Sequence, residues 1–184
     1  LLLTFSLVNA KAYSQKKTAP HYFLLIGTYD SPLSDGIYVY DFNSGNGTAE
    51  AVSHIPSSNP SYLAIAPNNK YVYAVNENAD SITHRGGGVS AFRFDRKNGT
   101  LTLLGKQSSQ GDHPCYVSVD ASGKWVLAGN YSSGNFSVLP ILKNGATGPA
   151  KTVMQLTGSG PDSNRQGSAH VHAVYFRKGT NELY

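Results

Sequence analysis

A repeat of just over fifty residues constrains the fold of this chain more than any other feature. Residues 59–65 (NPSYLAI) return 54 positions later as residues 113–119 (HPCYVSV), and a third copy (AHVHAVYF) begins at residue 169. Between these copies, residues 36–42 (GIYVYDF) return as residues 88–94 (GVSAFRF). Matched residues at a fixed period indicate an architecture made of copies of one supersecondary unit.

Each repeat unit reads as about four short strands. The apolar segments are rich in Val, Ile, Tyr and Phe, and turn signals separate them at residues 68–69, 98–99 and 122–123. No segment shows a sustained apolar period of 3.6 residues, so we expect almost no helix. The chain is therefore predicted to be all-β, a β-propeller of which about three blades are present. A β-sandwich is the main alternative, but sandwiches do not normally repeat a whole four-stranded unit.

Three Asn-Gly pairs occupy related places in the repeat, at residues 46–47, 98–99 and 144–145. Both residues tolerate positive φ, so these pairs predict tight hairpin turns. Asn46 and Asn98 also fit an Asn-x-Thr glycosylation acceptor. We favour the turn interpretation, since it explains the Gly as well as the Asn.

The N-terminus differs in kind from the rest. Residues 1–8 (LLLTFSLV) are apolar, and the following NAKA carries small residues at the two positions that a signal peptidase reads. A membrane-spanning helix needs about 20 apolar residues, and this run is too short. We expect residues 1–20 to be a signal peptide and linker, and residues 21–184 to be a propeller incomplete at its C-terminus. The protein is then exported, or cytoplasmic if the apolar run is instead a buried strand.

Charge argues against a polyanionic partner. The formal net charge is only +4, and no run of Lys or Arg is longer than Lys16-Lys17. A nucleic-acid or anionic membrane surface would need a clustered basic patch. The oligomeric state is not determined by these features.

Polar residues interrupt the repeat at three places where chemistry could sit. His170 and His172 share a face if the segment is extended, which suits a general base, an anion site or two metal ligands. Two satisfied structural histidines are the alternative. A metal would need a third ligand that no Cys/His/Asp cluster supplies, so we predict neither metal nor cofactor.

The other two places are strand ends and a loop. Asn76-Glu77 and its repeat partner Asn130-Tyr131 end equivalent strands, where Glu77, Asn130 and Tyr131 are candidates for substrate binding. The loop 158–167 (GSGPDSNRQG) leads into His170 and carries Arg165, whose guanidinium could hold a phosphate or carboxylate.

These motifs resemble the lactonase family of seven-bladed propellers, which includes propeller-type 6-phosphogluconolactonases and fungal carboxy-muconate lactonising enzymes. The resemblance rests on PCYVSVD (114–120), GNY (129–131), GNFSV (134–138) and the segment from GSGP at 158 to HVHAV at 170–174. It implies a ring of seven blades, roughly twice this length, and metal-independent hydrolysis of a small sugar lactone in the central channel. By position, Arg165, His170 and His172 match the family's site motif. Tyr116 replaces a common His, and Ala169 a common Pro.

On this resemblance, His172 or else His170 is the expected general base for water attack on the lactone carbonyl. Arg165 or Asn130 would then supply hydrogen bonds to the oxyanion. Two alternatives stay open because a propeller fold does not determine function. One is a non-catalytic extracytoplasmic propeller that binds a glycan or protein, and the other is a muconate-type cycloisomerase.

Overall fold

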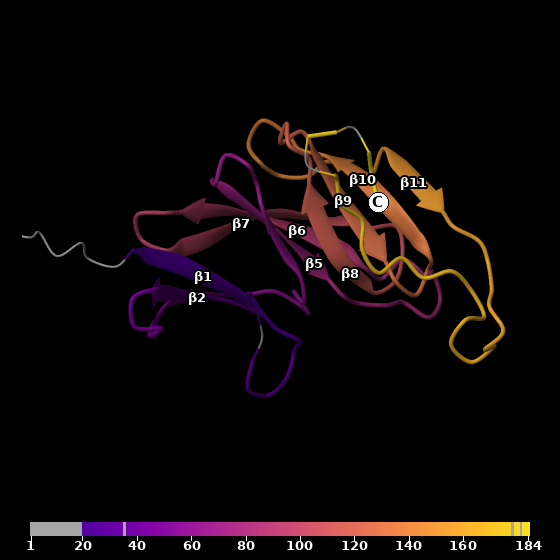
Figure 1. The fold of residues 1–184 in the computed structure, drawn as a ribbon, viewed down its shortest axis with the longest axis horizontal. Coiled ribbons are helices and arrows are strands. Elements are labelled where there is room, and N and C mark those ends of the chain that lie inside the picture. The colour runs from indigo at the N-terminus through magenta and orange to yellow at the C-terminus, as the bar shows by residue number, and fades with distance from the viewer. Residues whose placement is uncertain (1–19, 35, 178, 181) are drawn as a thin grey trace, which may run out of the picture.

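The described chain consists of β-strands arranged in three antiparallel sheets (Figure 1). The computed structural model describes residues 20–34, 36–177, 179–180 and 182–184, so the predicted signal segment lies almost wholly outside the described residues. Within those ranges there is no helix, and none long and apolar enough to cross a membrane. The predicted all-β propeller architecture is confirmed.

The first sheet has three strands and the other two have four. It comprises β1 (His21–Gly27), β2 (Gly36–Asn43) and β3 (Ala49–Pro56). The second comprises β4 (Leu63–Ile65), β5 (Tyr71–Asn76), β6 (Gly88–Asp95) and β7 (Thr100–Ser108). The third comprises β8 (Pro114–Val119), β9 (Trp125–Asn130), β10 (Asn135–Pro140) and β11 (Thr152–Gln155). The repeat aligns β1 with β5 and β9, so among the described residues the first sheet has no counterpart of β4 and β8.

β5 is buried on both faces because it lies between two neighbouring sheets. Val72 and Ala74 pack toward the first sheet in a cluster with Ile37. Tyr73 and Val75 point the other way, into a larger cluster with the third sheet. This explains the nearly continuous apolar run VYAV, since a strand buried on both sides has no face to give to polar residues.

The third copy of the repeat runs alongside β8 without forming a ladder. Ser118 Oγ donates to the backbone oxygen of Val174 at 2.7 Å. The Val171 and Val174 side chains are buried, whereas His170 and His172 are exposed. The segment is thus held by its valines, and its histidines face away from the core.

The Asn-Gly turns form where predicted, but only the glycine is left-handed. Gly47, Gly99 and Gly145 have φ of 75°, 66° and 89°, and none of the preceding asparagines is among the described residues with positive φ. Asn46 instead accepts from the Thr48 backbone N–H through its side-chain oxygen, at 3.0 Å. Positive φ is therefore used by the glycine alone, and the Asn46 side chain closes its turn.

Candidate functional site

A polar hollow of about 310 Å³ lies at one end of the three sheets. Three of its side chains lie just beyond equivalent strands: Glu77 and Tyr131 directly follow β5 and β9, and Tyr29 is two residues past the end of β1. The other lining residues are Ser61, Cys115 and His172. Each of the three sheets and the segment after β11 therefore contributes to one site.

The Glu77 carboxylate is held by two hydroxyl donors. Its Oε2 accepts a hydrogen bond from Tyr29 Oη at 2.8 Å and a close one from Ser61 Oγ. The Glu77 backbone N–H donates to the Asn59 oxygen at 3.0 Å, which fixes the residue at the strand end. Both side-chain bonds end on Oε2, so Oε1 is left to accept from a ligand hydroxyl.

The negative charge of Glu77 affects two neighbouring groups. Its hydrogen bond with Tyr29, helped by partial burial and by the charge of Glu77, raises the pKa of that phenol, which stays a donor at neutral pH. Burial, and then the charge of Glu77, raises the pKa of the Cys115 thiol. A thiol with a raised pKa is a poor nucleophile, because the thiolate is the reactive form. Cys115 is only half-buried, less than we expect for a free cysteine.

Both histidines meet Tyr131. The His170 ring stacks on the Tyr131 ring at 4.4 Å between centroids, and His172 meets it edge-on at 5.5 Å. His170 Nδ1 lies 3.0 Å from the Tyr131 backbone oxygen. A carbonyl only accepts, so Nδ1 carries the proton and the lone pair of a neutral His170 lies on Nε2. The two imidazoles do share a side of their segment, and His172 is the one that lines the hollow.

Asn130 lies beneath the hollow rather than in it. Its side chain is fully buried, and Nδ2 donates to the Ser109 oxygen at 2.8 Å and to Asn135 Oδ1 at 2.6 Å. Asn76 makes the corresponding bond to the Ser58 oxygen at 2.8 Å. Each amide thus holds the connection that leads from the preceding sheet into its own sheet. The residue after each of them, Glu77 or Tyr131, lines the hollow.

Arg165 is not brought to the hollow in this structure. It is exposed on the loop that follows β11, and its backbone N–H donates to the Asp162 oxygen at 3.2 Å. Figure 1 shows the stretch between β11 and the C-terminal segment extending away from the sheets. Of the six residues singled out in the sequence, Glu77, Tyr131 and His172 line the hollow and His170 stacks on its wall.

Three lining residues escaped the sequence analysis: Tyr29, Ser61 and Cys115. The repeat contained the signal for all of them. Tyr29 is two residues past the end of β1, close to the place that Glu77 and Tyr131 take after β5 and β9, and Cys115 is 54 positions after Ser61. Among the residues that the structure describes, no three His, Cys, Asp or Glu side chains are grouped as a metal would need.

Repeating antiparallel sheets of three or four strands define a β-propeller, and the hollow formed by equivalent strand ends is its candidate ligand site. The comparison with protein families is more specific. Residues 23–184 match the model described as "Lactonase, 7-bladed beta-propeller". The chain belongs to this lactonase family.

Similar proteins agree with this assignment. A 6-phosphogluconolactonase from Formosa agariphila is 32% identical over 88% of this chain and 45% of its own. A Bacteroides fragilis protein of known structure is 39% identical, with a TM-score of 0.84 over 92% of this chain and 46% of that one. The periplasmic gluconolactonase of Pseudomonas aeruginosa is 32% identical, with a TM-score of 0.79 over 89% and 46%. The chain thus spans less than half the length of these relatives.

Proposed function

We propose that the protein containing this chain is a lactone hydrolase that opens a sugar lactone at the hollow. The observation that carries the proposal is the convergence of Glu77 and His172, from different blades, on one cavity. Relatives named 6-phosphogluconolactonase and gluconolactonase, at about a third identity, support the same class of reaction.

In the proposed mechanism His172 is the general base. It takes a proton from a water whose oxygen attacks the lactone carbonyl carbon, and an imidazole suits this step because it exchanges a proton near neutral pH. Collapse of the tetrahedral intermediate breaks the ring C–O bond. The proton on His172 then passes to the departing ring oxygen, and the product is a hydroxy acid.

Glu77 and Tyr131 have binding roles in this proposal. Glu77 Oε1 accepts from a sugar hydroxyl, while Tyr29 and Ser61 hold the other oxygen. The Tyr131 ring, fixed by His170, forms an apolar wall against which a sugar ring can pack. Arg165 enters as a ligand for the oxyanion or for a substrate phosphate, which it would have to reach from its exposed loop.

The test is lactone opening by the full-length protein, with phosphorylated and neutral δ-lactones, each with and without chelator. We expect His172→Gln to lower kcat by about 10²–10⁴-fold. His170→Gln should have a smaller effect, since it acts through Tyr131. His21→Gln is the matched control, because that exposed histidine pairs with Asp41 outside the hollow.

Unchanged rates in both His170→Gln and His172→Gln would end the proposal. Arg165→Ala tests the role of Arg165. An increase in KM for the phosphorylated lactone alone indicates that Arg165 binds the substrate phosphate, and unchanged kinetics show that Arg165 does not belong to the site. A muconate-type substrate added to this panel tests for a cycloisomerase, which would convert it, whereas a glycan-binding propeller would open none of the lactones.

We also infer that the protein is exported. The apolar run at residues 1–8 and the NAKA that follows it support this, and one similar protein is named periplasmic. Cell fractionation with an antibody against the chain tests it. Recovery with cytoplasmic markers only would contradict export.

A further inference from the structure

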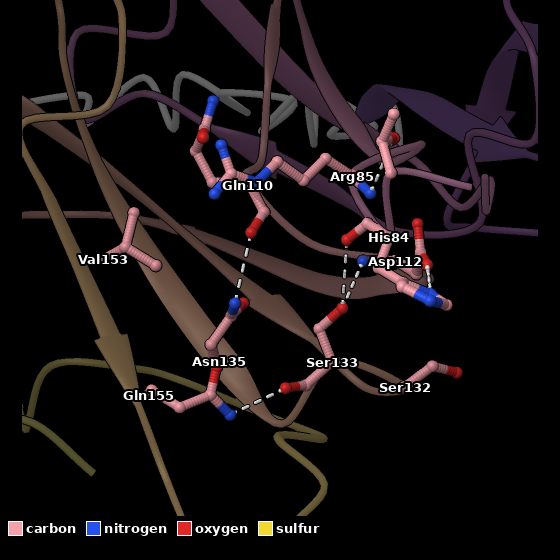
Figure 2. A pocket seen from close by; sticks show the side chains of 10 residues that line it. His84, Arg85, Gln110, Asp112, Ser132, Ser133, Asn135, Val153 and Gln155 are labelled. Atoms are coloured by element: carbon pink, nitrogen blue, oxygen red, sulfur yellow. Dashed lines mark hydrogen bonds and ion pairs between the residues drawn. The ribbon is translucent and has the colours of Figure 1, made fainter. Parts of the chain in front are cut away.

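A second cavity has a volume of about 520 Å³ and is drawn from close by in Figure 2. It is bounded by the loop after β5, the β7–β8 connection, the turn after β9, and β10 and β11. The hollow and this cavity share no lining residue, although Tyr131 lines one and the next residue, Ser132, lines the other. The volume is within the range of small-molecule sites, about 300–1,000 Å³.

A buried carboxylate shapes one wall. Asp112 is 5% exposed, and its Oδ1 accepts from the Gly86 backbone N–H at 2.7 Å and from the Asp80 N–H at 3.1 Å. Its Oδ2 lies 3.5 Å from His84 Nδ1. The Asp112 carboxylate is therefore occupied from the protein side, and its bonds fix the loop that carries Arg85.

Arg85 brings an uncommitted cation to the cavity. Its guanidinium makes no hydrogen bond or ion pair with any residue in the described ranges, and Figure 2 shows the side chain extending toward Gln110. The Gln110 side-chain amide is likewise free of hydrogen bonds to described residues. Two groups rich in N–H donors therefore face the same space, and a guanidinium in this state suits a carboxylate or phosphate.

Backbone strain is concentrated in the same lining. His84 and Gln110 have φ of 52° and 58°, in the left-handed region that few residues other than Gly adopt; His does so more often than most, and Gln110 is the more unusual of the two. Such strain persists where the surroundings impose it, and it clusters at ligand sites. Here the Asp112 bonds impose it at the loop of His84, and the bond from Asn135 Nδ2 to the Gln110 oxygen, at 3.1 Å, holds the other.

The remaining wall is polar and uncharged. Gln155 Nε2 donates to the Ser133 oxygen at 2.8 Å, which leaves its Oε1 as an acceptor, and Ser133 contributes a hydroxyl. A cationic edge opposite amide and hydroxyl groups is complementary to a molecule with one oxyanion and several hydroxyls.

We propose that this cavity binds a small anionic polyhydroxy compound, a sugar acid or a sugar phosphate, with its oxyanion on Arg85. The site does not depend on the proposed hydrolysis: binding here needs neither Glu77 nor His172. A sugar acid is also the chemical class that lactone opening produces. Ser132 of this cavity directly follows Tyr131 of the hollow in the chain.

The test is calorimetric titration of the full-length protein with gluconate, glucose 6-phosphate, inorganic phosphate and neutral glucose. We expect saturable binding of an anionic sugar, weaker binding of inorganic phosphate, and none of glucose at the same site. The gluconate and glucose 6-phosphate arms distinguish a carboxylate from a phosphate. Arg85→Ala should weaken binding about tenfold or more, because it removes charge-assisted hydrogen bonds.

Arg93→Ala is the matched control, since Arg93 is an exposed arginine on β6 that does not line the cavity. It should bind as the unmodified protein does, and Arg85→Ala should open lactones at the unmodified rate. Gln110→Ala is a second variant that should also weaken binding. The proposal is overturned if no anionic sugar binds saturably, if Arg85→Ala and Gln110→Ala bind unchanged, or if only His172→Gln abolishes binding.

Discussion

Asn76 and Glu77 are neighbours in the chain and serve different parts of the molecule. Asn76 is buried and bonds to the connection between sheets, whereas Glu77 holds Tyr29 and Ser61 at the hollow. Asn130 and Tyr131 repeat the arrangement one blade later. The strand-end pair is thus a structural amide followed by a site residue.

Asn130→Ala should therefore affect stability more than substrate binding. The substitution leaves the buried Asn135 Oδ1 without its donor and removes one of the two donors to the Ser109 oxygen, which keeps Ser137 Oγ. We expect a loss of about 1–3 kcal/mol in the free energy of unfolding of the full-length protein, measured with urea, and an unchanged KM. Asn76→Ala is the matched variant and should behave alike. If KM rises while the unfolding midpoint stays constant, Asn130 binds substrate instead.

At the scale of the strands and turns, the β6–β7 hairpin fixes how two sheets meet. Gly99 has φ of 66° in the turn, and its backbone oxygen accepts from Ser53 Oγ of the first sheet. A Cβ added there would lie 2.5 Å from Phe23 Cε1. Glycine is needed both for the conformation of the turn and for the close approach of the sheets.

Gly99→Ala should consequently cost more than Gly47→Ala. Gly47 has φ of 75°, but a Cβ there would meet nothing within 4 Å. Alanine at Gly47 costs only the left-handed conformation, about 1–2 kcal/mol. Crowding adds about 1–3 kcal/mol more at Gly99. Urea unfolding of the two full-length variants measures the difference, and equal losses would show that the first two sheets move apart freely.

Most of the strands and turns could be predicted from the sequence. Repeat copies identified equivalent strands, and Gly and Asn marked the turns. The sequence did not show that Asn46 would close its turn through the side chain, because an Asn-Gly pair is compatible with several turns that differ in side-chain bonding. It also did not show that 169–175 would lack a ladder, since strand pairing depends on neighbours that a local pattern does not contain.

At the scale of the whole molecule, the two outer sheets expose apolar faces. On β1, Tyr22, Leu24 and Ile26 share one face and are 56%, 40% and 41% exposed, and Met154 of β11 is 50% exposed. In the interior, the corresponding face of β5 is fully buried by the adjacent sheet. Contiguous apolar surface of this kind marks a place where another part of a protein packs.

The 184-residue chain on its own should therefore be less stable than the longer protein. We expect the isolated chain to bind the dye ANS and to melt without a sharp transition, because faces that a ring would bury stay in water. The full-length protein, measured side by side, should melt cooperatively and bind little dye. A sharp, cooperative melt of the isolated chain would contradict this expectation.

The site was the part hardest to predict as a whole. Glu77, Tyr131 and His172 could be found because each breaks the repeat with a reactive or aromatic side chain. Asn130 and Arg165 are equally able to bind a substrate oxygen. Asn130, however, is buried and bonds to the connection between sheets, and Arg165 lies on an exposed loop. Whether a polar residue faces a cavity depends on the packing of neighbouring blades, which composition and spacing do not specify.

The equivalence of Tyr29, Glu77 and Tyr131 has an evolutionary consequence. Each sheet presents one of these side chains to the hollow, one or two positions beyond the end of β1, β5 or β9. A point mutation at such a position changes the chemistry of the hollow and leaves the packing between blades intact. A ring that arose by tandem duplication can thus diversify its substrates one blade at a time, with no insertion or deletion.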